Sequence, residues 1–214
     1  MDLEHQNIVV AFRHALIDRL GETLYKTFAD SHIAILGLGG LGSHAAISLA
    51  RNGIGKLTLI DFDRVEMSNL NRQQYRLVDL GKYKCHALSE VIVSFNPLIE
   101  LIAQPIRLTP DNVADYVKDV DLVLECLDEA EAKAWLVRTL RSELPDIPFI
   151  AASGMAGIGS ANQIHSRKVS DNFYLCGDET SDVAEMGSLI CPRVAVCAGH
   201  QALTALRLLA NVED

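Results

Sequence analysis

A glycine-rich turn between an apolar run and a helical pattern is the feature that most constrains the fold of this chain. Residues 33–36 are uniformly apolar, and Gly37, Gly39 and Gly42 then match the spacing G-x-G-x-x-G. In such a turn the first glycine permits the bend, the second lets a phosphate approach the backbone, and the third lets helix and strand pack closely. The N–H groups at the start of the following helix attract phosphate oxygens. The sequence therefore predicts that a nucleotide binds at this turn.

The remaining apolar pattern predicts alternating strands and helices. We expect strands near residues 32–37, 56–61, 98–103, 120–126 and 147–153, and helices near 41–53, 82–95, 110–118 and 129–143. An amphipathic helix over 7–29 precedes them, residues 160–187 are polar and rich in turn formers, and an apolar stretch over 194–209 reads as a closing helix. This order predicts an α/β fold of Rossmann-like type, in which a mainly parallel sheet carries helices on both faces.

Length and composition limit the classes of protein that are possible. The 214 residues, 49% of them hydrophobic, suit one sizeable domain spanning 1–214. A net charge of −9 argues against a nucleic-acid or anionic-membrane partner. No apolar run approaches the roughly 18 residues that a membrane span needs, and no signal peptide is recognisable, so we expect a cytoplasmic protein. The five cysteines lack C-x-x-C spacing, which favours reduced thiols over disulfides.

Polar residues gather after the second and fourth expected strands. Asp61 lies 24 residues after Gly37, where a carboxylate can bind ribose hydroxyls. Behind it come acidic, amide, hydroxyl and basic side chains, namely Asp63, Ser68, Asn69, Arg72, Gln73 and Lys84. Arginine and lysine supply fixed positive charge for phosphate oxygens. Asp128 ends the fourth strand, where a carboxylate can hold Mg²⁺ together with substrate phosphates. These residues together predict a site that activates ATP.

At these positions the chain resembles the ThiF/MoeB group of adenylyltransferases, which are relatives of ubiquitin-activating enzymes. The resemblance covers nearly the whole chain and rests on Gly37–Gly42, Asp61–Asp63, Ser68–Gln73, Gly81 with Lys84, Asp128, and Pro192–Val194 with Gln201 and Ala202. The short length, the Pro192-Arg193-Val194 run and the absence of a C-terminal zinc-binding cysteine pair favour the shorter, ThiF-like branch of thiamine biosynthesis.

The resemblance implies a reaction and a role for each matching residue. The C-terminal glycine carboxylate of a small ubiquitin-like sulfur carrier, ThiS-like in this branch, would attack the α-phosphate of ATP and release pyrophosphate. Asp61 would hold the ribose, Asp128 would bind Mg²⁺, and Asn69, Arg72, Gln73 and Lys84 would hold the phosphates, with Gly37, Gly39, Gly40, Gly42, Asp63 and Ser68 completing the ATP site. Family members often form homodimers in which an N-terminal arginine reaches the partner's site. Arg13 is the nearest match, so the catalytic set is Arg72, Lys84, Asp128 and Arg13.

The chain departs from the family pattern at its cysteines. Only Cys176 remains of the first zinc-binding pair and the second pair is missing, so we expect no structural zinc. Relatives that continue to thioester or sulfur-transfer chemistry carry a reactive cysteine where this chain has Val183. The expected chemistry therefore stops at the adenylate, and Cys176 is a weaker candidate substitute. His44, just inside the helix after the glycine turn, is interpreted as filling its first turn.

Three alternatives remain open at this stage. Activation of a MoaD-like carrier for molybdopterin synthesis would use the same chemistry. The glycine turn with Asp61 alone would permit an NAD-dependent dehydrogenase, although Arg72 and Lys84 argue against it. A non-catalytic scaffold that binds a carrier would explain the missing cysteine, but the presence of Arg72, Lys84 and Asp128 argues for an enzyme.

Overall fold

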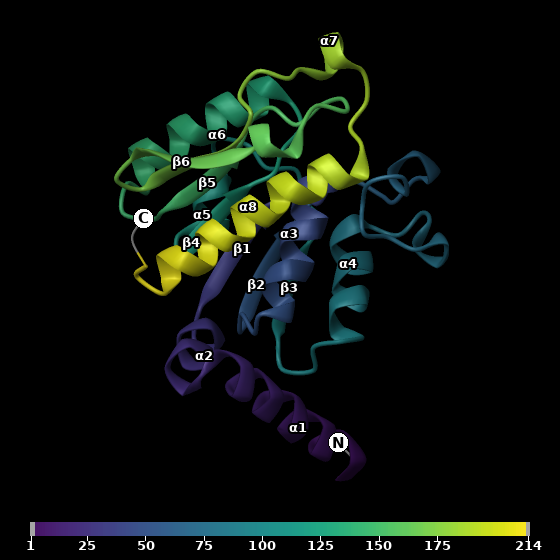
Figure 1. Cartoon of the computed structure of the whole chain (residues 1–214), viewed down its shortest axis with the longest axis vertical. Coiled ribbons are helices and arrows are strands. Elements are labelled where there is room, and N and C mark those ends of the chain that lie inside the picture. The colour runs from purple at the N-terminus through teal and green to yellow at the C-terminus, as the bar shows by residue number, and fades with distance from the viewer. Residues whose placement is uncertain (1–2, 213–214) are drawn as a thin grey trace.

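The fold is built on one twisted sheet, which the computed structural model shows within the described residues, 3–212 (Figure 1). Its seven strands have the order β3-β2-β1-β4-β5-β7-β6. The strands are β1 (His32–Leu36), β2 (Lys56–Ile60), β3 (Glu100–Gln104), β4 (Leu122–Glu125), β5 (Phe149–Ala152), β6 (His165–Ser170) and β7 (Phe173–Gly177). The helices are α1 (Leu3–Leu20), α2 (Glu22–Ala29), α3 (Gly40–Arg51), α4 (Lys84–Val93), α5 (Val113–Val117), α6 (Ala130–Glu143), α7 (Val183–Met186) and α8 (Cys191–Leu209). Short 3₁₀ turns occur at η1 (Met67–Asn69), η2 (Leu77–Asp79) and η3 (Ala161–Gln163).

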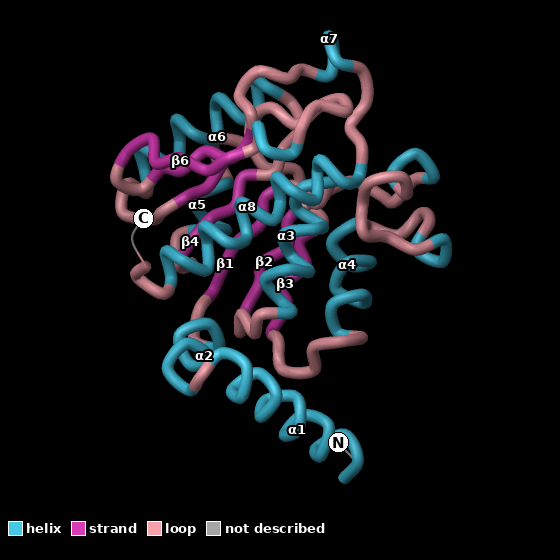
Figure 2. The backbone as a smooth tube through the Cα atoms, in the orientation of Figure 1, coloured by secondary structure: helices cyan, strands magenta, loops and turns pink. Residues whose placement is uncertain are grey.

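Strands β1 to β5 and β7 run parallel to one another, and the edge strand β6 runs antiparallel to β7. Parallel strands need helices on both faces because their side chains are apolar on both sides. One face packs against α3, α4 and α8 through residues such as Ile33, Ile35 and Leu124. The other packs against α5 and α6 through residues such as Leu36 and Val123 (Figure 2). The predicted Rossmann-like α/β fold is confirmed.

Helix α8 lies along α3 and closes one face of the sheet (Figure 1). Its fully buried Gln201 donates through Nε2 to the backbone carbonyls of Glu125 and Ile150, at 3.0 and 3.3 Å. This amide therefore ties the helix to β4 and β5. The expected closing helix is confirmed, although it begins at Cys191, three residues before the predicted start.

Two local predictions were wrong. The helix predicted over 7–29 is two helices, because Gly21 adopts φ +80° between α1 and α2. The turn-rich stretch 160–187 contains the β6–β7 hairpin, which extends the sheet beyond β5. Strand β6 is largely exposed and carries Arg167 and Lys168, so it lacks the apolar alternation by which strands are recognised. Within 3–212 no helix is both long and apolar enough for a membrane crossing.

Candidate functional site

The glycine turn lies at the carboxyl end of β1, between that strand and α3. Gly37 has φ +90°, and a Cβ atom there would lie 2.6 Å from the backbone oxygen of Cys126, just beyond β4. A Cβ atom on Gly42 would lie 1.9 Å from the backbone oxygen of Gly37. Both positions therefore require glycine, one for its backbone conformation and one for the close packing of α3 on the turn.

The polar segment 68–75 packs directly on this turn. The Tyr75 hydroxyl donates to the Leu38 carbonyl at 2.7 Å, and the Gln74 N–H donates to Ser43 Oγ at 3.2 Å. Gln73 Nε2 lies 3.8 Å from the position that a Cβ atom would take on Gly39. The structure thus brings the predicted Gln73 amide to the predicted phosphate-binding backbone, and Arg72 Cγ lies 3.8 Å from the position that a Cβ atom would take on Gly40. Tyr75 and Gln74 are site residues that the sequence reasoning missed, although they directly follow the recognised motif.

Two polar groups of this segment have no hydrogen-bond partner among residues 3–212. Arg72 donates through Nη1 to the Ser68 carbonyl at 3.1 Å and to Asn71 Oδ1 at 2.8 Å, yet its Nε is buried and unpaired. Gln73 Oε1 is also buried and unpaired. Buried polar groups nearly always have a hydrogen-bond partner in a native protein or its complex. An unpaired N–H and an unpaired amide oxygen beside the glycine turn therefore fit a polar ligand there.

Asp61 and Lys84 form a charged layer behind the turn. Asp61 Oδ2 accepts from the Leu38 N–H at 2.7 Å and Oδ1 accepts from the Asp63 N–H at 2.8 Å. Burial raises the pKa of Asp61, while Lys84 and these two N–H groups oppose that rise. The buried Lys84 ammonium lies 2.7 Å from Asp63 Oδ2 and 3.9 Å from Asp61 Oδ2. Asp61 thus orients the glycine turn itself, and its predicted contact with ribose stays a prediction.

Asn69 and Ser68 shape the segment, and their predicted contacts with ATP stay predictions. Asn69 Oδ1 accepts from the Glu66 N–H at 3.0 Å and so closes η1, and Asn69 is almost fully buried. Ser68 is exposed, with its hydroxyl 3.4 Å from Glu66 Oε2. The observed contacts of both residues hold the chain in the shape that presents Arg72 and Gln73.

Asp128 is exposed in the loop between β4 and α6. This loop begins beside the glycine turn, because a Cβ atom on Gly37 would lie 3.1 Å from the Leu127 nitrogen. In residues 3–212 no group of three or more histidine, cysteine or acidic side chains could hold a metal ion. A single carboxylate at this position still fits Mg²⁺, since that ion is commonly held by one or two carboxylates, water and substrate phosphates.

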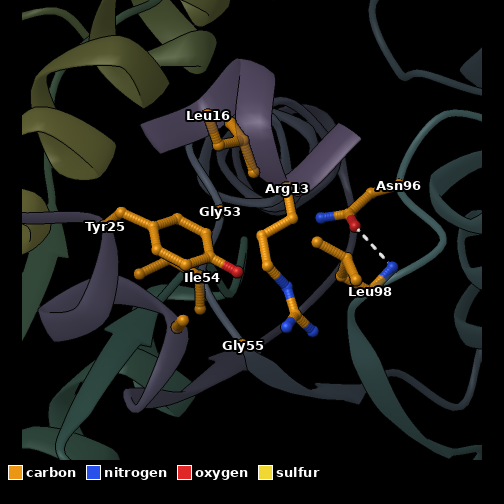
Figure 3. Close-up of a pocket in the computed structure, with 9 residues that line it drawn as sticks. Arg13, Leu16, Tyr25, Gly53, Ile54, Gly55, Asn96 and Leu98 are labelled. Atoms are coloured by element: carbon orange, nitrogen blue, oxygen red, sulfur yellow. Dashed lines mark hydrogen bonds between the residues drawn. The ribbon is translucent and has the colours of Figure 1, made fainter. Parts of the chain in front are cut away.

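Arg13 lies at the opposite edge of the sheet from the glycine turn. It lines a cavity of about 170 Å³ with Tyr25, Gly55, Asn96 and Leu98, which lie at the amino ends of β2 and β3 or on α2 (Figure 3). The glycine turn follows the carboxyl end of β1, so the fold does not bring Arg13 to the other candidates within one chain. Its predicted action in a partner's site stays a prediction.

A buried ion pair anchors the loop that follows β7. Arg193 of α8 pairs with Asp178, and both side chains are nearly inaccessible. Burial raises the Asp178 pKa, but the Ser181 and Thr180 N–H groups and Arg193 outweigh it and lower the pKa to about 2. The pair fixes the start of the 178–190 loop against α8. The sequence marked Arg193 only through a motif and did not predict its partner.

The fold and site together define a class: a Rossmann-like α/β protein whose glycine turn is covered by a polar segment with unpaired groups. The chain belongs to the ThiF family, whose model matches residues 12–214.

Its relatives include several named enzymes. The tRNA threonylcarbamoyladenosine dehydratase of Escherichia coli K12 is 39% identical over 146 residues, covering 67% of this chain and 54% of the relative. The aligned sequence region therefore covers about half the length of that protein. The sulfur carrier protein ThiS adenylyltransferase of the same organism is 31% identical over 206 residues, covering 94% of this chain and 81% of the relative.

Solved structures agree with this family assignment. The crystal structure of the E. coli dehydratase has a TM-score of 0.83 and 26% identity, and the match covers 94% of this chain and 95% of that one. A structure of the same enzyme in complex with ATP has a TM-score of 0.82 and 28% identity, covering 92% and 93% of the two chains.

Proposed function

We propose that this protein is an ATP-dependent adenylyltransferase that activates the C-terminal glycine carboxylate of a small ubiquitin-like sulfur carrier. The observation that carries this proposal is the pair of unpaired polar atoms, Arg72 Nε and Gln73 Oε1, beside the glycine turn. Membership of the ThiF family supports it, as do the relative named for ThiS adenylylation and the related enzyme crystallised with ATP. The dehydrogenase alternative gains no support from the named relatives reported above.

The residues suggest how the reaction proceeds. A carrier carboxylate oxygen forms a bond to the α-phosphorus while the bond from that phosphorus to the bridging oxygen breaks, and pyrophosphate leaves. The backbone N–H groups at the start of α3, the Arg72 guanidinium and the buried Lys84 ammonium stabilise charge on the phosphates. Asp128 would hold Mg²⁺, which neutralises phosphate charge when bound. A carboxylate nucleophile needs no general base, so catalysis rests on positioning and charge.

For the carrier, we favour a ThiS-like protein over a MoaD-like one. The match to the ThiS adenylyltransferase extends over 94% of this chain, and Pro192-Arg193-Val194 agrees with the ThiF-like branch. We further propose that residues 1–214 act as one unit within a homodimer. In that dimer Arg13, which is exposed on α1, would reach the partner's nucleotide.

A second candidate substrate is a tRNA nucleoside. The 39% identity and the TM-score of 0.83 to a tRNA-modifying dehydratase favour it. The net charge of −9 disfavours it, because tRNA binding depends strongly on basic side chains that neutralise phosphates. We therefore rank it below the carrier.

The test is ATP–pyrophosphate exchange with a ThiS-like carrier, a MoaD-like carrier and tRNA that carries threonylcarbamoyladenosine, added in turn. Exchange that needs the ThiS-like carrier and is abolished by Asp128→Ala supports the proposal. Asp146→Ala is the matched control, because this exposed aspartate precedes β5 at the other edge of the sheet. Exchange that occurs only with tRNA, or not at all, contradicts the carrier assignment.

A further inference from the structure

One of the five thiols differs from the others in its surroundings. Cys85, Cys126, Cys176 and Cys197 are buried, and burial raises the pKa of each, to about 11 for Cys85 and about 12 for Cys197. Such thiols are poor nucleophiles because the thiolate is the reactive form. Cys191 is partly exposed and is the first residue of the 19-residue helix α8. A helix N-terminus favours negative charge.

A histidine lies next to this thiol. The Cys191 Sγ is 3.7 Å from His44 Nε2, and Gln74 Nε2 lies 3.1 Å from each ring nitrogen of His44. The His44 ring also hydrogen-bonds to the backbone of Arg72, and burial lowers its pKa, so the ring is neutral at neutral pH and can accept a proton. A nucleophile, a base and a group that orients the base come here from α8, α3 and the 68–75 segment.

The helix α3, which carries His44, also connects this thiol to the glycine turn. Gly40 and His44 are four residues apart and lie on one face of α3. Val194 lies one turn along α8 from Cys191. Its Cγ1 atom lies 2.8 Å from the position that a Cβ atom would take on Gly40, and Arg72 Cγ lies 3.8 Å from that same position. There is no room between these helix ends for even a methyl group. On the side of Gly40, a group added beside His44 therefore meets space that Val194 and Arg72 already fill.

We propose that Cys191 and His44 form a modification site for soft carbon electrophiles, and that an adduct on Cys191 closes the glycine turn to nucleotide. In the reaction Sγ forms a bond to the electrophilic carbon, the leaving group departs with the electrons of the broken bond, and the thiol proton passes to His44 Nε2. The adduct weakens nucleotide binding by moving Arg72 away from the turn. Because coupling between two sites is reciprocal, bound nucleotide also disfavours the adduct. The nucleotide part of this inference rests on the proposed function.

The first experiment measures how fast iodoacetamide labels each cysteine of the whole protein, followed by peptide mass spectrometry. We expect labelling at Cys191 first, at least tenfold faster than N-acetylcysteine at the same pH, and about tenfold slower in His44→Asn. His86→Asn is the control, since His86 is exposed on α4 and its ring lies against Tyr83. Gln74→Ala provides a second variant that keeps the histidine, and it should slow labelling less. Labelling no faster than the free thiol, or unchanged in His44→Asn, overturns the site.

The second experiment compares ATP affinity, by calorimetry, for untreated protein and for protein alkylated at Cys191. We expect at least tenfold weaker binding after alkylation, and no effect of the reagent on Cys191→Ala. Equal affinity before and after alkylation overturns the coupling. If untreated protein binds no ATP, the coupling and the proposed function both fail, whereas the labelling rates still decide whether the thiol site exists.

Discussion

The Tyr75 hydroxyl offers a sharp test of how the glycine turn is held. Replacing Tyr75 with phenylalanine removes one oxygen and leaves the ring, so packing changes little. That oxygen donates to the Leu38 carbonyl at 2.7 Å, and Leu38 is fully buried. A neutral hydrogen bond contributes about 1 kcal/mol net, and a buried carbonyl left without its donor costs about 1–3 kcal/mol. We therefore expect Tyr75→Phe to lower the free energy of unfolding by about 1–2 kcal/mol.

Urea unfolding followed by circular dichroism measures this change. Tyr116→Phe is the matched control, because in residues 3–212 no hydrogen bond of the partly buried Tyr116 hydroxyl is seen, and it lies on the α5–α6 face of the sheet. Leu38 is also held through its N–H by Asp61, so ATP affinity should fall in Tyr75→Phe but the turn should still form. A loss of stability equal to that of Tyr116→Phe would refute the reasoning, since the hydroxyl would then contribute nothing.

The other predictions address the turn, the phosphate contacts and the buried ion pair. Gly37→Ala should lower the melting temperature by several degrees, because φ +90° disfavours alanine by about 1–2 kcal/mol and its Cβ would lie 2.6 Å from the Cys126 oxygen. Arg72→Ala should fold normally yet lose orders of magnitude in pyrophosphate exchange, and near-normal exchange would show that the phosphate contact is misassigned. Asp178 has its pKa lowered from 3.8 to about 2, so it should contribute about 2 kcal/mol of stability that is complete above pH 3.8 and is lost as pH falls through about 2. In acid titrations of unfolding, Asp178→Asn should lack that loss, and parallel curves for both proteins would contradict the assignment.

The sequence predicted most of the sheet because each central strand carries its own signal. Strands β1, β2 and β4 are short apolar runs between turn formers, and their predicted positions agree with the structure within a few residues. The hairpin of β6 and β7 escaped prediction because β6 is exposed and charged and is recognised only by its pairing with β7. Gly21 can be read directly from the sequence, but the apolar spacing typical of a helix continues on both sides of it, so the end of one helix and the start of the next were not predicted.

The candidate site was likewise predicted only in part from the sequence. The motif residues Arg72, Gln73 and Lys84 could be named from the sequence, since charge and spacing are local properties. What the sequence did not indicate was which atoms are already engaged. The structure shows that Asp61 is occupied by two backbone N–H groups, while Arg72 Nε and Gln73 Oε1 have no hydrogen-bond partner among residues 3–212.

By itself, then, the sequence determined the glycine turn, the alternation of strands and helices and the identity of the charged residues. These depend on backbone conformation and on the order of neighbouring side chains. Only the tertiary structure decided which distant residues meet. His44 and Cys191 are 147 residues apart in sequence and lie in contact because α3 and α8 pack side by side. Arg13 lies at the far edge of the sheet because α1 packs near the amino ends of β2 and β3. Packing of helices on a sheet joins residues without any local signal, so these relations became visible only in the fold.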